Sequence, residues 1–189
     1  MRLLLITLFG SLTLAGCVAT SYKSVTVDSA LPANAETLSR CPLSLEVGQS
    51  CMARVQADQW TSPTGIHVKG TGEIYRITVL PNQVWFDADR RNTPPHGEKG
   101  SWIMNLSKKR HDAGFFRLMV DVQPEAASAG ETAKPVTGIF DFEYTTTGKG
   151  KIVLYPNDAI GPPNDPQYYY RNNSGYIWVT IERRPVKST

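Results

Sequence analysis

The 189-residue sequence has no apolar run long enough to span a membrane, no large excess of either charge, and no sustained helical period after residue 17. A membrane-spanning helix needs about 20 apolar residues, and the longest run here, residues 3–14, is too short. Lysine and arginine number 20 against 17 acidic residues, and the short basic clusters at 108–110 and 183–184 do not indicate a nucleic-acid-binding protein. This length fits one domain with its own core.

Catalytic motifs are also missing. The three histidines, at positions 67, 96 and 111, have no paired metal-binding spacing, and no serine lies in a Gly-x-Ser-x-Gly motif. We therefore expect no enzyme activity.

Cysteine is scarce, and the first of the three cysteines follows a secretory signal. A basic start at Met1-Arg2, the apolar run and small residues before Cys17 predict a signal peptide over residues 1–16. The ending Leu14-Ala15-Gly16-Cys17 resembles the lipobox of bacterial lipoproteins. The resemblance implies cleavage before Cys17, its lipidation, and attachment of the mature chain to the membrane through that lipid. The alternative is an ordinary signal peptide with a stray cysteine.

The residues after Cys17 refine this expectation. Val18 stands where enterobacterial lipoproteins of the inner membrane carry aspartate, so the resemblance implies an outer-membrane lipoprotein on the periplasmic or cell-surface side. Residues 17–40 are small and polar, and we expect a flexible tether. Cys41 and Cys51 remain as a pair in an oxidising compartment and predict a disulfide; two free thiols are the alternative.

Short strands and turn residues alternate from residue 43 onward, which predicts an all-β fold: an antiparallel jelly-roll β-sandwich over residues 41–184, with a tail at 185–189. Period-two alternation is clearest at 176–182. We expect the four tryptophans to fill the core, and residues 123–135 to form a surface loop or a short helical turn. The expected strands are 52–57, 65–69, 73–80, 84–87, 102–106, 115–122, 139–145, 151–155 and 176–182.

Polar residues cluster near the C-terminus, where Asn157-Asp158 and Asn172-Asn173 flank a proline-rich loop. Carboxylate and amide oxygens are ligands that Ca²⁺ prefers. The same residue types also form ordinary turns, which is the alternative interpretation.

The order of residues favours the first interpretation, because the C-terminal third resembles the bacterial PA-I-type galactophilic lectin and its relatives, which are calcium-dependent jelly-roll sugar-binding domains. The similarity spans about residues 52–183 and is most specific in three segments: Thr137-Gly138-Ile139-Phe140, the apolar run 150–155 leading to Asn157-Asp158, and Asn172-Asn173-Ser174-Gly175 with the alternating strand that follows. It implies a galactose-binding-like domain that binds carbohydrate. The loop between Asp158 and Asn172 is longer here than in that lectin, and one calcium-binding loop residue has no clear counterpart.

Residue by residue, the resemblance implies a calcium site formed by Asp158, Asn172 and Asn173, with a backbone carbonyl near 87–89. Asp158 and Asn172 would also contact the sugar. His96 would approach a ring hydroxyl, and Lys99 stands where the family often has glutamine.

Three consecutive tyrosines, 168–170, cannot all be buried because neighbouring side chains point apart. A partly exposed Tyr169 suits a binding surface for glycan or protein, although the tyrosines could also simply attach the loop to the sandwich. Two functions follow as hypotheses. The first is non-catalytic, calcium-dependent carbohydrate binding by a membrane-anchored lipoprotein. The alternative is a structural or assembly lipoprotein that docks on an envelope protein complex without metal or sugar.

Overall fold

The computed structural model describes residues 41–88, 90–99, 107–124, 134–135 and 141–186. These residues form β-strands and one short 3-10 helix, η1 (Tyr168–Asn172). The strands are β1 (Ser50–Gln56), β2 (Ser62–Val68), β3 (Ile74–Val79), β4 (Trp85–Asp87), β5 (Arg90–Thr93), β6 (Leu118–Gln123), β7 (Lys134–Pro135), β8 (Phe142–Thr145), β9 (Gly150–Pro156) and β10 (Tyr176–Arg184). Within this part of the chain, no helix is long and apolar enough to cross a membrane.

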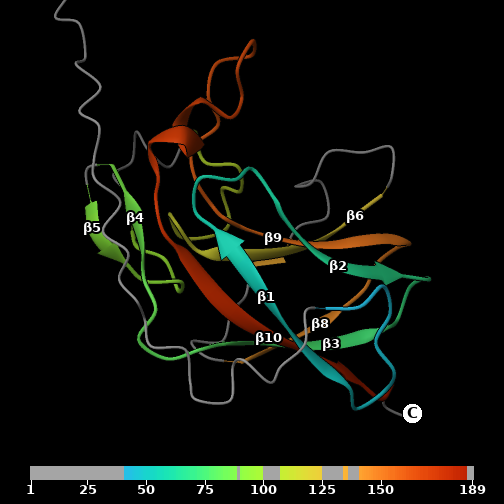
Figure 1. Cartoon of the computed structure of the whole chain (residues 1–189). Helices are drawn as coiled ribbons and strands as arrows, with labels where there is room; N and C mark the ends of the chain where they lie inside the picture. Colours follow the sequence, from blue (N-terminus) through green and yellow to red (C-terminus); the bar gives the residue numbers. More distant parts are fainter. Residues whose placement is uncertain (1–40, 89, 100–106, 125–133, 136–140, 187–189) are drawn as a thin grey trace, which may run out of the picture.

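Two four-stranded antiparallel sheets face each other (Figure 1). One has the strand order β1-β10-β3-β8 and the other β2-β9-β6-β7, while β4 and β5 form a separate ribbon. The prediction of an all-β antiparallel sandwich is thus confirmed. The helix η1 lies at the end of the sandwich where β1 ends and β10 begins (Figure 1).

The core lies between the sheets and follows the alternation expected for β10. Ile177, Val179 and Ile181 are fully buried, whereas Tyr176 and Trp178 on the opposite face are partly exposed. Burying one face of a strand fixes its register, because a slip of one residue would turn every apolar side chain to the other face.

The strand expected at 115–122 begins only at Leu118. Phe115 and Phe116 are both buried and their rings are 5.2 Å apart, which strict alternation along a strand does not allow. Phe116 has a φ of 57°, so the chain turns there and both rings enter the core. The following strand β6 is buried on both faces: Met119 and Asp121, which alternate with its core-facing residues, are buried as well.

Several expected boundaries differ. The strand expected at 65–69 begins earlier, at Ser62, and forms β2, where the register against β9 shifts between Pro63 and His67. Proline is tolerated in β2 because β2 is an edge strand. No strand lies on its outer side, so the backbone N–H that proline lacks would have no partner there. Of the expected loop 123–135, residues 134–135 form β7 against β6, and 125–133 lie outside the described residues. The expected strand 102–106 and the first two residues of the one at 139–145 also lie outside them.

The first described residues are attached to the sandwich by the predicted disulfide, which joins Cys41 to Cys51 in β1. The Leu43 carbonyl accepts a 2.8 Å hydrogen bond from the backbone N–H of His67 in β2. The Cys41–Cys51 disulfide joins residues 10 apart in the sequence, and closing a loop of this length stabilises the folded state by about 2.5 kcal/mol in the chain-entropy model. The expected signal peptide, Cys17 and the tether lie outside the described residues.

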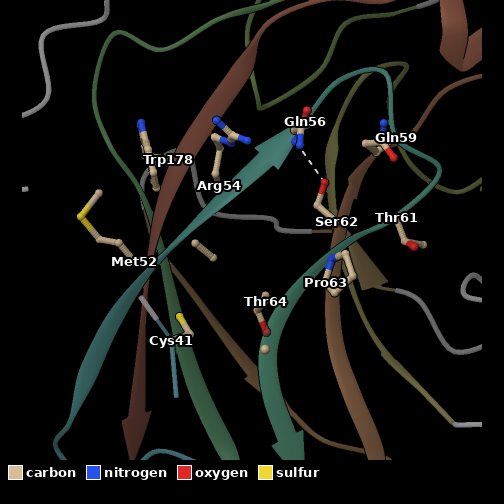
Figure 2. Close-up of a pocket in the computed structure, with 12 residues that line it drawn as sticks. Cys41, Met52, Arg54, Gln56, Gln59, Thr61, Ser62, Pro63, Thr64 and Trp178 are labelled. Atoms are coloured by element: carbon tan, nitrogen blue, oxygen red, sulfur yellow. Dashed lines mark hydrogen bonds between the residues drawn. The ribbon is translucent and has the colours of Figure 1, made fainter. Parts of the chain in front are cut away.

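Only one of the described tryptophans is fully buried. Trp85 is completely inaccessible, whereas Trp60 and Trp178 are partly exposed, and Trp102 lies outside the described residues. The expectation that tryptophans fill the core was therefore wrong for Trp60 and Trp178. Trp178 lines a pocket along the seam between the edge strands β1 and β2 (Figure 2). Trp60 lines a second pocket, beside Gln123 at the end of β6 and Gln167.

Candidate functional site

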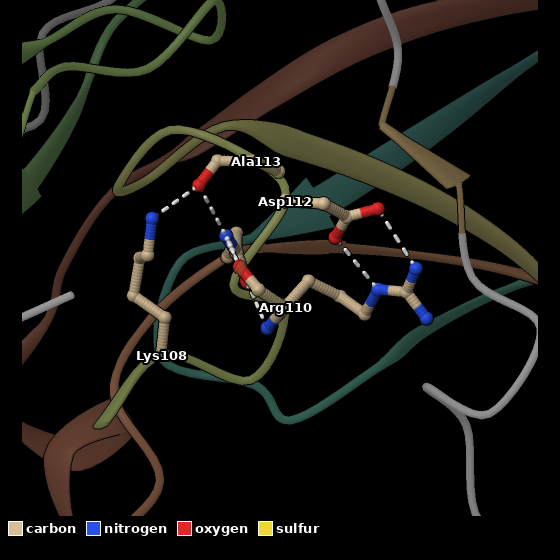
Figure 3. Close-up of polar contacts among 5 residues, drawn as sticks. Lys108, Arg110, Asp112 and Ala113 are labelled. Carbon is tan, nitrogen blue, oxygen red and sulfur yellow. Dashed lines mark hydrogen bonds and ion pairs between the residues drawn. The ribbon is translucent and has the colours of Figure 1, made fainter. Parts of the chain in front are cut away.

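Asn157, directly after β9, is a structural residue. Its side chain is fully buried, and its Oδ1 accepts a hydrogen bond from the backbone N–H of Arg110 at 2.8 Å. Its Nδ2 donates to the carbonyls of Arg110 and Gly114 at 2.9 and 3.0 Å. Lys108 donates to the carbonyl of Ala113 in the same turn, and Arg110 pairs with Asp112 (Figure 3). Asn157 therefore fixes the 110–114 turn against the end of β9.

The next residue, Asp158, is brought together with Asn173. Both side chains are buried, with 2% and 5% exposure. The Asp158 carboxylate accepts hydrogen bonds from Asn173 Nδ2 at 2.7 Å and from the backbone N–H of Ala159 at 2.6 Å. Asn173 Nδ2 also donates to the carbonyl of Ala57 at 3.2 Å, which connects the site to the end of β1.

The electrostatics of Asp158 are unusual for a carboxylate. Burial raises its pKa to about 6; the hydrogen bonds from Asn173 and Ala159 act in the opposite direction, and the negative charge of Asp87 raises the pKa further. Asp87 belongs to β4, and paired 2.9 Å backbone bonds between Phe86 and Ser174 bring this strand beside Asn173. The site thus contains one buried carboxylate, that of Asp158, with the Asp87 carboxylate close enough to act on it.

The Oδ1 atom of Asn173 is buried and has no hydrogen-bond partner among the described residues. An unpaired buried acceptor costs free energy, and here it lies on the side chain that contacts the Asp158 carboxylate. The described residues contain no cluster of three or more histidine, cysteine or acidic side chains that could hold a metal. A site here would therefore combine carboxylates with amide and carbonyl oxygens, a donor set that fits calcium.

The loop between Asp158 and Asn173 is held by Tyr170. Its side chain is fully buried, and its hydroxyl donates to the carbonyl of Pro156 at 2.8 Å. Tyr168 and Tyr169 are 55% and 41% exposed, with their rings in an edge-to-face contact at 5.2 Å. Asn172, at the end of η1, is exposed.

An aromatic cage around Lys109 lies behind this site, and no sequence pattern indicated it. The Lys109 ammonium is 3.6 Å from the Trp60 ring centroid, 3.9 Å from that of Tyr155 and 5.9 Å from that of Tyr170. Burial lowers the Lys109 pKa to about 7, while the charge of Asp121 acts in the opposite direction. The electron-rich ring faces favour the ammonium form. The backbone N–H of Lys109 donates to the Asp158 carbonyl at 2.8 Å, so the cage supports the site directly.

The other residues named from the sequence lie on a neighbouring loop. His96 is exposed in a turn, and Lys99 lines a pocket of about 350 Å³ together with Lys108, His111 and Asp112. Asp158 does not line that pocket. The structure therefore brings Asp158 and Asn173 into contact, places Asn172 and Tyr169 on the exposed side of the same loop, and leaves Lys99 in a separate depression.

No protein-family model matches the chain, and no curated protein matches it. Among solved structures, the chain is similar to one described as "EclA N-terminal domain; PllA-like lectin". The TM-score is 0.46 and the sequence identity 19%, and the match covers 70% of this chain and 95% of that one.

Proposed function

We propose that this protein is a non-catalytic carbohydrate-binding lipoprotein, anchored in the outer membrane through Cys17, with a calcium-dependent sugar site at Asp158 and Asn173. The observation that carries the calcium site is the unpartnered, buried Asn173 Oδ1 beside the buried Asp158 carboxylate. A cation bound here would neutralise the Asp158 carboxylate and would give the Asn173 Oδ1 lone pair the partner that it lacks.

Each residue of the site has a distinct role in this proposal. Asp158 supplies the charge, and the two hydrogen bonds it accepts fix the orientation of its carboxylate. Tyr170 holds the loop against Pro156, so that Asn172 and Tyr169 are presented on its exposed side for contact with the sugar. When bound, calcium would offer coordination positions to vicinal sugar hydroxyls.

Calorimetric titration of calcium into the chelator-treated, full-length protein in a zwitterionic detergent tests the metal site. We expect saturable binding that Asp158→Asn weakens by about tenfold or more, because calcium affinity depends on ligand charge. Asp165→Asn is a matched control, since Asp165 lies in the same loop but is paired with Arg171. Absence of binding by the folded wild-type protein, or equal affinity in Asp158→Asn, would overturn the metal site. A following titration with galactose, with and without chelator, tests the sugar.

The exposed Tyr168–Tyr169 pair favours a second candidate function, docking on an envelope protein without metal or sugar. Tyrosine is enriched at protein interfaces, and two adjacent exposed rings provide an apolar surface at the edge of the fold. In this case the double variant Tyr168→Ser/Tyr169→Ser should lose a partner that co-purifies with the wild type and with Asp158→Asn. Retention of the partner by the tyrosine variant would argue against docking through this pair.

A further inference from the structure

The seam between β1 and β2 contains a second candidate binding site, away from Asp158. Both strands are sheet edges, and between them lies a pocket of about 570 Å³ (Figure 2). Its lining includes Arg54, Gln56, Gln59, Thr61 and Trp178. None of the described residues that line it is acidic.

The backbone of Trp178 is positioned at this pocket by Gln83. The buried side chain of Gln83 donates to the Trp178 carbonyl at 2.7 Å and accepts from its backbone N–H at 2.6 Å. The partly exposed Trp178 ring also contacts Tyr176 edge-to-face, with centroids 6.1 Å apart. A partly exposed aromatic ring offers a flat apolar surface on which a sugar ring can stack, and a tryptophan side chain has only two rotatable bonds to order on binding.

Arg54 brings a positive charge to the same place. It lies directly opposite Trp178 in the β1–β10 register, and its side chain is exposed. Its guanidinium group is 5.3 Å from the Tyr176 ring centroid, so in the described structure it faces a ring rather than a carboxylate. By contrast, arginines 76, 110, 171, 183 and 184 each pair with a carboxylate. The Arg54 guanidinium can therefore take an anionic group from a ligand.

Two of the pocket's lining residues also line a second pocket. Gln59 and Thr61 line both, and the second pocket, of about 430 Å³, is also lined by Trp60 and Gln167. We call these two adjoining pockets the groove: the first offers Trp178 and Arg54, and the two share the neutral amide and hydroxyl groups of Gln59 and Thr61. An oligosaccharide, with several linked sugar rings and many hydroxyls, fits these aromatic and neutral polar lining residues better than a single small molecule does.

We propose that this groove binds an acidic oligosaccharide, with a sugar ring on Trp178 and a carboxylate on Arg54, independently of calcium. An added peptide strand is less suited to the groove, because Pro63 offers no N–H on β2 and Leu43 already bonds His67 further along the same strand. The contacts assigned to Trp178 and Arg54 use no residue of the Asp158 site, so the two proposals can fail separately.

Calorimetry with tetragalacturonic acid tests the groove, using the full-length protein in zwitterionic detergent and in the presence of a calcium chelator. We expect saturable binding, weakened about tenfold by Trp178→Ala and by Arg54→Gln. The methyl-esterified tetrasaccharide should bind the wild type weakly and should not distinguish it from Arg54→Gln. Arg76→Gln is the matched control, because it removes an arginine of the same sheet that is already paired with Asp141.

Two further arms keep the test decisive. Trp178→Phe retains a ring and should bind better than Trp178→Ala, which separates the loss of the stacking surface from a loss of folding. Asp158→Asn should bind the tetrasaccharide as the wild type does. The proposal would be overturned by any of three results: no binding to the wild type, equal binding of a tetraglutamate peptide, or loss of binding in Asp158→Asn.

Discussion

Replacing Tyr170 with alanine should lower the free energy of unfolding by about 3–5 kcal/mol, the range typical of removing a buried aromatic side chain. The Tyr170 ring is fully buried and makes an edge-to-face contact with Trp60 at 5.2 Å. Its hydroxyl donates to the Pro156 carbonyl, and its ring forms one side of the cage around Lys109. Urea unfolding followed by circular dichroism measures the change.

Two companion variants separate the contributions. Tyr170→Phe keeps the ring and loses the two buried hydrogen bonds of the hydroxyl, the one donated to the Pro156 carbonyl and the longer one accepted from the Asp158 N–H, so a loss of about 1–2 kcal/mol is expected. Tyr169→Ala removes an exposed ring from the same run and should change stability by less than about 0.5 kcal/mol. If Tyr169→Ala proved as harmful as Tyr170→Ala, the assignment of Tyr170 as the residue that holds the loop would be wrong.

The second large effect is a dependence of stability on pH that arises from Asp158. Its pKa in the folded protein is raised to about 6, from an ordinary value of 3.8, so the folded state holds the proton more tightly than the unfolded state does. Stability from this group is therefore greatest below about pH 4, and it is lost as the pH rises toward 6. The shift corresponds to about 3 kcal/mol in the absence of calcium.

Asp158→Asn isolates this contribution, because an amide does not titrate and its oxygen can still accept the bond from Asn173. In the presence of a chelator, the variant should be more stable than the wild type at pH 7, and this advantage should disappear near pH 4. The groups that face the carboxylate are the Asn173 amide, the Ala159 N–H and the more distant Asp87 carboxylate. Urea unfolding of both proteins at several pH values provides the measurement. A stability difference that does not vary with pH would show that Asp158 has an ordinary pKa.

The candidate site was only partly predictable. The sequence singled out Asp158 and Asn173, and the structure places their side chains in contact at 2.7 Å. The sequence could not distinguish the roles of neighbouring residues in Asn157-Asp158 and Asn172-Asn173, because successive side chains point in different directions. In the structure Asn157 supports a turn, and Asn172 is exposed. Lys109 gave no sequence signal, since its cage joins Trp60, Tyr155 and Tyr170 from distant parts of the chain.

The sequence by itself determined the all-β class, the two faces of β10, the Cys41–Cys51 pair and the impossibility of burying all three tyrosines. Each of these depends on local alternation, on turn residues or on a simple count. The tertiary structure alone decided that Phe115 and Phe116 both enter the core, that Trp178 and Arg54 meet at an open seam, and that Asp158 lies beside Asn173. A local pattern fixes which face of a strand is buried, but the pairing of distant strands and loops is set by how the whole core packs.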